Sequence, residues 1–424
     1  MKLIIDALTS NPQVSDYKVN ITAKESYELF FVKGKLETVR ATSTCDKQVT
    51  VYADHGECKG DSQFFVYPST TQEELTTLVE KAVEKALLIN NKTYTLPENE
   101  AGCFEVPSNF QDYELPALAD TISKCVFRAN TLPNADLNSV EVFVNRYTET
   151  VRNSRGIYKT QVRYDAMVEA IPTYNGEAQS VELYEQYNFG SLDEAALVRE
   201  IAGKMAEVKA RYEAIKPETI PGCKVILNAL EVANLFSNIC YDLNYSAVYS
   251  HANLFKKGDK IQKEPVGDRI GITMAGQVAG NIRSSKFDSD GMSLGSIRIV
   301  EDGAALNYYG SNRFGQYLGE TPTGNLRCTC VDAGTVKAEE FAQGPYLEVI
   351  SMSGLQVDFY NDYIGGEVRL AYWHDGEKIL PITGVSISGK LEDVLNKLRL
   401  SETTTVHNGY VGPEKAILSD MKIF

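Results

Sequence analysis

Histidine is scarce in this sequence. The 424 residues include only four histidines, which lie far apart: His55, His251, His374 and His407. None stands in HExxH, HExxxH or HxH spacing, so the helix-borne pair that commonly holds a catalytic zinc is absent. There is also no GxxxxGK[ST] phosphate-binding loop and no GxGxxG after an expected strand. These common catalytic motifs are therefore not the source of any activity of this chain.

Long apolar runs are missing as well. No stretch approaches the ~20 consecutive apolar residues needed to cross a bilayer. The first residues contain one short apolar run, which Asp6 interrupts, unlike the longer apolar region of a secretory signal. The eight cysteines are spread thinly and form no CxxC pair. We therefore expect a cytoplasmic protein with free thiols and no membrane partner.

Basic residues are outnumbered by acidic ones. The chain has 42 Lys and Arg against 57 Asp and Glu, which gives a formal net charge of −15. Such a surface repels a phosphate backbone, and no Lys/Arg cluster offsets it, so we expect no nucleic-acid partner. The share of hydrophobic residues, 43%, is that of an ordinary globular protein.

The first half of the chain alternates between strand and helix patterns. Residues 26–36 and 48–54 have the composition of strands, with Gly34 supplying a turn. A helix follows, in which Thr71 and Glu74 can form a capping box. We predict a connection at 90–115 and a helix at 116–130, then strands at 138–150, 157–171 and 180–188. A second helix, opened by Ser191, is expected at 191–214.

The proline-containing segment 216–222 marks the clearest domain boundary. We predict an α+β fold, with a mixed sheet-and-helix domain at 1–215 and a β-rich, barrel-like domain at 216–424. The first domain has two expected sub-parts, at about 1–95 and 116–215. In the second domain, a short strand and an amphipathic helix precede many short strands separated by turns.

Four short runs are more specific than the composition. Residues 285–303 contain SKFDSDG and then IVEDG, residues 318–325 contain LG and then TGN, and residues 354–389 contain a glycine-rich tail with GEKI. In the first half, NSRG at 153–156 closes an expected hairpin. Together these runs resemble the TldD/PmbA family, often called modulators of DNA gyrase, although Asp290 replaces the usual glutamate. The resemblance spans nearly the whole chain.

The resemblance implies a metallopeptidase framework. TldD-type members carry HExxxH on a helix, and a cysteine near the C-terminus completes their zinc site. The matching positions here are Leu230, Glu231 and Leu235 on the helix and Val411 near the C-terminus. Only the glutamate remains, so we expect no metal and no catalytic residue in this chain, with Glu231 a possible relic.

Loss of these ligands is similar to the PmbA (TldE) branch. The resemblance implies a non-catalytic subunit that binds and processes extended peptides together with a TldD-like catalytic partner, which would carry the zinc. An extended peptide can add as a strand to a sheet edge, and glycines permit its close approach, although they equally serve tight backbone geometry. The candidate substrate-binding residues are Thr323, Gly324, Asn325, Gly354, Gly365 and Gly366.

Two other interpretations remain open. The chain could be an autonomous metallopeptidase with non-standard ligands, such as His251 and nearby acidic residues. It could instead be a homodimeric peptide- or ligand-binding protein. Tyr241, Tyr245 and Tyr249 recur at helical spacing, which predicts one packed helical face. Zinc in the purified chain would favour the first interpretation, and a TldD-type chain encoded nearby would favour the subunit.

Overall fold

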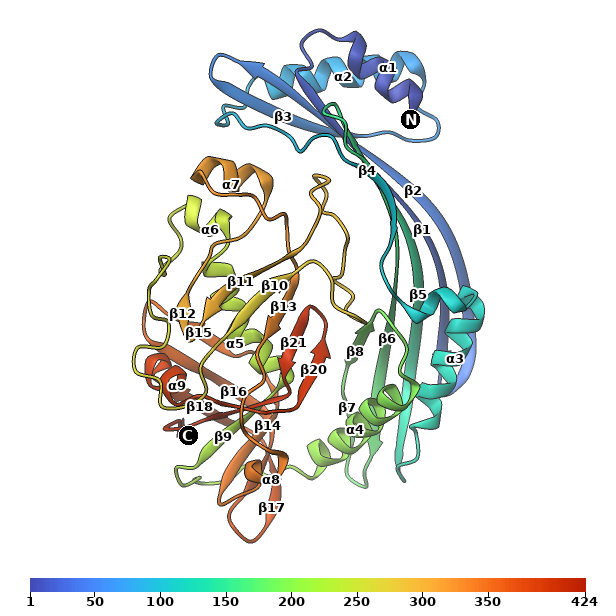
Figure 1. Ribbon diagram of the computed structural model, residues 1–424. Helices are drawn as coiled ribbons and strands as arrows, with labels where there is room; N and C mark the ends of the chain where they lie inside the picture. Colours follow the sequence, from blue (N-terminus) through green and yellow to red (C-terminus); the bar gives the residue numbers. More distant parts are fainter.

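The computed structural model describes residues 1–424 as an α+β protein built on three sheets, as expected from the sequence. A long curved sheet forms one side of the molecule, and the elements after residue 213 lie within its curve (Figure 1). The curved sheet has eight strands in the order β3-β2-β1-β5-β6-β4, with β7 and β8 also paired to β6. Its strands are β1 (Asp16–Val32), β2 (Lys35–His55), β3 (Cys58–Phe65), β4 (Ala101–Glu105), β5 (Ala135–Asn153), β6 (Tyr158–Asn175), β7 (Ser180–Glu182) and β8 (Glu185–Phe189).

The two faces of this sheet differ in polarity because side chains alternate along each strand. Val142 on β5 and Val168 on β6 are fully buried beneath α3 (Leu115–Arg128) and α4 (Glu194–Glu213) in one apolar cluster. At the other end of the sheet, α1 (Lys2–Ser10) and α2 (Gln72–Ala86) cover a second apolar cluster. The opposite, concave face carries the polar residues of β1, β5 and β6.

The remaining two sheets contain six and nine strands and share the largest apolar core, which includes the buried side of α5 (Ala229–Asp242). The six-stranded sheet consists of β10 (Ile272–Ala275), β11 (Ser296–Glu301), β12 (Ala304–Ala305), β13 (Cys328–Val331), β20 (Thr404–His407) and β21 (Tyr410–Pro413). The nine-stranded sheet consists of β9 (Lys224–Asn228), β14 (Tyr346–Met352), β15 (Gln356–Asp358), β16 (Tyr363–His374), β17 (Ile379–Ile382), β18 (Val385–Gly389), β19 (Arg399–Leu400), β22 (Lys415–Leu418) and β23 (Lys422–Ile423). The helices of this part are α5 (Ala229–Asp242), α6 (Tyr245–Tyr249), α7 (Asn312–Leu318), α8 (Ala338–Phe341) and α9 (Leu391–Lys397).

Several local predictions are confirmed and others are wrong. The capping box of Thr71 and Glu74 is present at the start of α2. Helix α4 is capped by Asp193 rather than opened by Ser191. The expected connection at 90–115 contains β4 and a short 3₁₀ helix, Asn109–Asp112.

The three tyrosines do not form one packed face. Because α5 ends at Asp242 and α6 starts at Tyr245, the helical spacing is interrupted between them. Tyr245 is consequently buried, whereas Tyr241 remains 64% exposed. None of the helices is both long and apolar enough to cross a membrane.

Candidate functional site

The motif loop 285–293 joins the last two sheets to the concave face of the curved sheet. Lys159 on β6 is completely buried, and its Nζ donates to the Gly291 carbonyl and to Ser293 Oγ, both at 2.8 Å. The same ammonium lies 2.6 Å from a Glu100 carboxylate oxygen. A second ion pair joins Lys18 on β1 to Asp290 at 2.5 Å. The first motif run thus forms a polar joint between two distant parts of the chain.

Asp288 links this loop to the second motif run. Its buried carboxylate accepts the backbone N–H groups of Asp290 and Met292 through one oxygen, at 2.9 and 3.0 Å. The other oxygen accepts the backbone N–H and the Nδ2 of Asn325, at 2.9 and 3.2 Å. Burial raises the pKa of Asp288, the nearby charge of Asp290 adds to the rise, and the N–H donors oppose it.

The Thr323–Asn325 segment is fixed by contacts within the fold. Thr323 Oγ1 accepts the N–H of Gly310 at 2.9 Å. Gly324 has φ of +77°, and an added Cβ would lie 2.4 Å from Leu294 Cδ2, so only glycine fits there without displacement. Gly324, and not Asn325, takes the left-handed conformation in this segment.

A cavity of about 370 Å³ lies beside this joint, between the concave face and the loops. From the sheet, Glu149 and Arg163 line it, while Arg283, Asn325 and Arg327 line it from the loops. The complete lining is Asn20, Ile21, Thr22, Glu149, Thr150, Val151, Gln161, Arg163, Asp165, Ile282, Arg283, Ser284, Ser285, Phe287, Asp288, Ser289, Leu294, Asn325 and Arg327.

The charges of the cavity are only partly compensated within the chain. Arg163 donates to Glu149 at 3.0 Å and to Asp165 at 3.2 Å, and its guanidinium lies over the Tyr147 ring at 3.9 Å. Arg283 and Arg327 are exposed and form no ion pair. The cavity therefore presents two free guanidinium groups beside the amide of Asn325, an arrangement suited to carboxylate or main-chain carbonyl oxygens.

The other three glycine candidates lie in the nine-stranded sheet and its adjoining loop, not in the lining of this cavity. An added Cβ at Gly365 would lie 2.3 Å from the Ile387 carbonyl oxygen, and one at Gly366 would lie 2.4 Å from that of Gly354. Gly354 itself has φ of +137° and is exposed. These positions are explained by close packing of the backbone, and the structure does not bring them together with Asn325.

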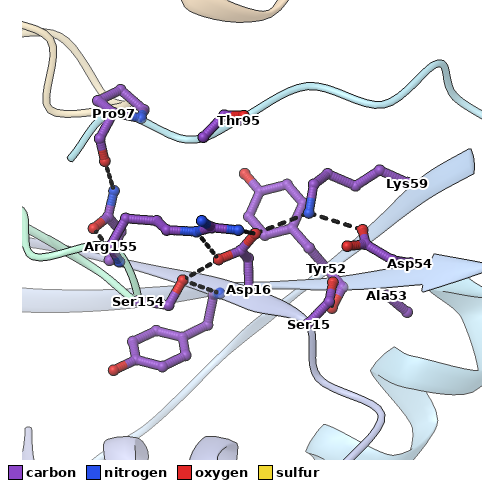
Figure 2. A network of polar contacts seen from close by, with 12 residues as sticks. Ser15, Asp16, Tyr52, Ala53, Asp54, Lys59, Thr95, Pro97, Ser154 and Arg155 are labelled. Carbon is purple, nitrogen blue, oxygen red and sulfur yellow. Dashed lines mark hydrogen bonds and ion pairs between the residues drawn. The ribbon is translucent and has the colours of Figure 1, made fainter.

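The NSRG run forms a second polar network, at the turn between β5 and β6 (Figure 2). The buried Asp16 accepts Nε of Arg155 at 2.7 Å, Oγ of Ser154 at 2.6 Å and Nζ of Lys59 at 2.9 Å. Burial acts to raise the pKa of Asp16, but these hydrogen bonds outweigh it and hold the pKa below its usual value. Asn153 orders the turn by accepting the N–H of Arg155 at 2.9 Å. The network ties the turn to the start of β1.

The helix positions implied for a zinc site lie on α5 and carry no donor set. Glu231 is buried in the first turn, where burial raises its pKa and its carboxylate accepts Nδ2 of Asn234 at 3.0 Å. Leu235 is fully buried in the apolar core, and Leu230 is 47% exposed. Neither leucine, nor Val411 on β21, has an atom that can bind zinc. No group of three or more His, Cys, Asp or Glu side chains is placed to hold a metal ion. The residues present therefore do not fit the zinc that the family resemblance implies.

The residues on the concave face were not predicted from the sequence. Lys159, Arg163, Glu149 and Lys18 were not singled out, although polar residues recur at every second position in this part of β5 and β6. That alternation indicates a polar face but not which distant loop covers it.

Known proteins with similar sequences and structures place this chain near one family. Residues 221–423 match the family described as the PmbA/TldA metallopeptidase C-terminal domain. A curated protein of Haemophilus influenzae named metalloprotease PmbA homolog is 22% identical over 425 residues, covering 92% of this chain and 88% of the relative.

Solved structures with the same fold cover this chain completely. TldE from Thermococcus kodakarensis has a TM-score of 0.79 at 15% identity, with 99% of that chain covered. A protein of Bacteroides thetaiotaomicron described as a modulator of DNA gyrase has a TM-score of 0.80 at 13% identity, with 98% covered. Residues 221–423 therefore belong to the PmbA/TldD family, and the PmbA relative extends the similarity over most of the chain.

Proposed function

We propose that this chain is a PmbA/TldE-like, non-catalytic subunit that binds extended peptides and works with a TldD-type metallopeptidase partner. One observation carries the proposal: on α5 and β21, leucine and valine occupy the positions where the resemblance implies zinc ligands. Leu235 is packed in the core, so its position is part of the fold and not a site open to a metal. Zinc and its activated water would then come from the partner.

The cavity beside the motif loop supports a role in binding peptide. Its lining combines the free guanidinium groups of Arg283 and Arg327 with the amide of Asn325. Guanidinium groups bind carboxylates with charge-assisted hydrogen bonds, and an amide can both donate to and accept from a peptide backbone. A peptide with acidic side chains or a free C-terminus is therefore the preferred occupant.

Metal content and complex formation test the subunit assignment. We expect the purified chain to hold no stoichiometric zinc after dialysis, to co-elute with a TldD-type partner in size-exclusion chromatography, and to raise the partner's peptidase activity. Near-stoichiometric zinc that only a strong chelator removes would overturn the proposal. It would instead favour the autonomous metallopeptidase, for which His251 is the candidate ligand.

Charge removal tests the cavity. Arg283→Ala and Arg327→Ala should weaken binding of an acidic fluorescent peptide by about tenfold each, since a charge-assisted hydrogen bond contributes about 1.5–3 kcal/mol in total and less where it is exposed. Arg269→Ala is the matched control, because Arg269 is also exposed and does not line the cavity. Equal affinity in all three variants would show that peptide binds elsewhere.

A further inference from the structure

The charges in the cavity beside the motif loop are separated into two poles. On the sheet side, Glu149 and Asp165 share a single guanidinium, that of Arg163, so the carboxylates of this side are in excess. On the loop side, Arg283 and Arg327 are exposed and form no ion pair. A ligand that complements both sides therefore needs a cationic group and an anionic group.

Both arginines of the loop side adjoin the turn between β20 and β21. An added Cβ at Gly409 would lie 3.0 Å from Cγ of Arg283 and 3.1 Å from the carbonyl oxygen of Arg327. The carboxylate on this side, Asp288, does not pair with them, because both of its oxygens already accept backbone N–H groups. The loop side is therefore suited to a carboxylate, which guanidinium groups hold with charge-assisted hydrogen bonds.

The sheet side offers acceptors to a further cation. Gln161 is only 2% exposed; its Nε2 donates to Glu149 at 2.7 Å, and its Oε1 accepts the Lys286 N–H at 2.8 Å. Gln161 thus fixes the position of the Glu149 carboxylate. Asn145 donates to Asp165 at 2.7 Å, and the Oδ1 of Asn145 is buried without a hydrogen-bond partner. An ammonium group carries three donors and accepts nothing, so carboxylate and amide oxygens are the partners it requires.

The dimensions of the cavity suit a short peptide. Its lining takes residues from the neighbouring strands β1, β5 and β6, so it extends about 10 Å across the sheet. Three residues of an extended peptide span about 10 Å. The cavity volume of about 370 Å³ lies at the lower end of the range for small-molecule sites, about 300–1,000 Å³.

We propose that this cavity binds short peptides by both termini, with the carboxylate at Arg283 and Arg327 and the ammonium at Glu149 and Asp165. The inference rests on the peptide-binding role proposed above, and it narrows the occupant of the cavity to peptides of about three residues with free ends. Hydrolysis of a peptide bond produces one new carboxylate and one new ammonium group. Peptide hydrolysis is therefore the class of reaction that supplies such ligands, and the cavity takes up its short products.

Capped peptides test the two poles separately. Isothermal titration calorimetry near pH 7 compares trialanine with its N-acetyl derivative, its C-terminal amide and the doubly capped form. We expect trialanine to bind with the highest affinity and each single cap to weaken binding by about tenfold, because each cap removes one charge-assisted contact. The doubly capped peptide should bind about a hundredfold more weakly than trialanine. None of these peptides has an acidic side chain, so they differ only in their termini.

Removal of the two arginines assigns the carboxylate to the loop side. In a variant with both Arg283→Ala and Arg327→Ala, amidation of the peptide should no longer weaken binding, whereas acetylation should still weaken it by about tenfold. Arg269→Ala is the matched control, because Arg269 is exposed and does not line the cavity. Circular dichroism establishes that each variant keeps the fold.

Neutralisation of one carboxylate assigns the ammonium to the sheet side. In Glu149→Gln, Arg163 is balanced by Asp165 alone, so the excess of carboxylate is lost. Acetylation should then weaken binding by about threefold or less, whereas amidation should still weaken it by about tenfold. Glu105→Gln is the matched control, because Glu105 is exposed on β4 and does not line the cavity.

The outcomes distinguish this inference from the proposed function. Loss of affinity on capping either end, removed one end at a time by the variants, supports binding by both termini. Equal affinity for trialanine and its doubly capped form overturns it, and so does discrimination at the carboxylate end alone. If trialanine does not bind but the acidic fluorescent peptide still binds in a manner that depends on Arg327, this inference fails and the proposed peptide-binding role stands. If neither peptide binds, both fail.

Discussion

Replacement of Lys159 by methionine should loosen the joint between the curved sheet and the rest of the molecule. The side chain is 0% exposed, and its ammonium contacts three oxygens, on Gly291, Ser293 and Glu100. Lys159→Met keeps the length and most of the volume of the side chain. It removes the charge and every donor, so the change is confined to the polar contacts.

The expected loss is about 3 kcal/mol in the free energy of unfolding. Breaking a buried ion pair costs about 3–5 kcal/mol. We take the lower end because Glu100 is 47% exposed at its side chain and can regain water. The Gly291 carbonyl loses its buried donor, which accounts for about 1–3 kcal/mol of the loss. A loss of 3 kcal/mol corresponds to about a 150-fold increase in the equilibrium constant for unfolding.

Two spectroscopic probes can follow this loss in urea. The single tryptophan, Trp373 on β16, reports on the nine-stranded sheet, whereas far-ultraviolet circular dichroism reports on all three sheets. In the unmodified chain a firm joint should make the two transitions coincide. In Lys159→Met we expect the circular dichroism transition to move to lower urea and to separate from the fluorescence transition. Lys24→Met is the control, because Lys24 lies on the same face and is only partly buried.

A Lys159→Met variant that stays within about 0.5 kcal/mol of the unmodified chain, with both transitions coincident, would contradict a stabilising role for this joint, since that is the range of an ordinary surface substitution. Buried water would then have replaced the ammonium without cost to the joint.

Asp16→Asn should lower stability by about 3 kcal/mol near pH 7, because it removes a buried charge partner of Arg155. The folded pKa of Asp16 is below its unfolded value, so its stabilisation is present above about pH 4 and is lost as pH falls through the folded pKa. The urea midpoints of Asp16→Asn and of the unmodified chain should therefore differ most near pH 7 and approach each other as the pH is lowered below about 4. Gly324→Ala should cost about 2 kcal/mol in a urea titration, since its Cβ would press on Leu294. Thr71→Ala should cost about 1 kcal/mol, measured the same way, because it removes the α2 cap.

Matched substitutions isolate each cause. Gly319 has a similar φ of +71° with open space around it, so Gly319→Ala carries the backbone strain of Gly324→Ala without its clash. Thr77→Ala alters an exposed threonine of α2 outside the cap. Asp6→Asn removes an exposed carboxylate outside any ion pair. If the urea midpoint of Asp16→Asn equals that of Asp6→Asn near pH 7, the polar network around Asp16 does not stabilise the fold. If Gly319→Ala and Gly324→Ala lose equal stability, the cost at Gly324 comes from backbone strain alone and not from the contact with Leu294.

Local elements could be predicted because their signals are local. The Thr71 cap and the long strands β5 and β6 follow from turn residues and alternation within a few positions. Residues 37–47 of β2 were missed because all of them except Lys47 are exposed, on both faces of the strand, which leaves no apolar alternation to detect. The pairing of β1 with β5, such as Lys18 with Asn153, joins segments more than a hundred residues apart, and no local pattern encodes it.

The candidate site was predictable only in pieces. The family resemblance selected both the 285–291 run and Thr323–Asn325, yet only the structure shows that Asp288 connects them. It grouped Gly365 and Gly366 with Asn325, although the two glycines lie in the nine-stranded sheet and Asn325 lies in the loop before β13. Arg283 and Arg327 belong to no motif that would single them out, since an exposed arginine is ordinary until a cavity is found beside it.

The position of β1 in the middle of the curved sheet constrains how the protein is made. Its first neighbour, β2, leaves the ribosome immediately after it, but its second neighbour, β5, begins only at Ala135. During synthesis one side of β1 must therefore wait for more than a hundred further residues before it finds its partner. Long-range pairing of this kind is slow and exposes strand edges meanwhile. We expect folding intermediates of the nascent chain to include the β1–β2–β3 meander with α2, and early chaperone contacts to concentrate on the β1 side later covered by β5.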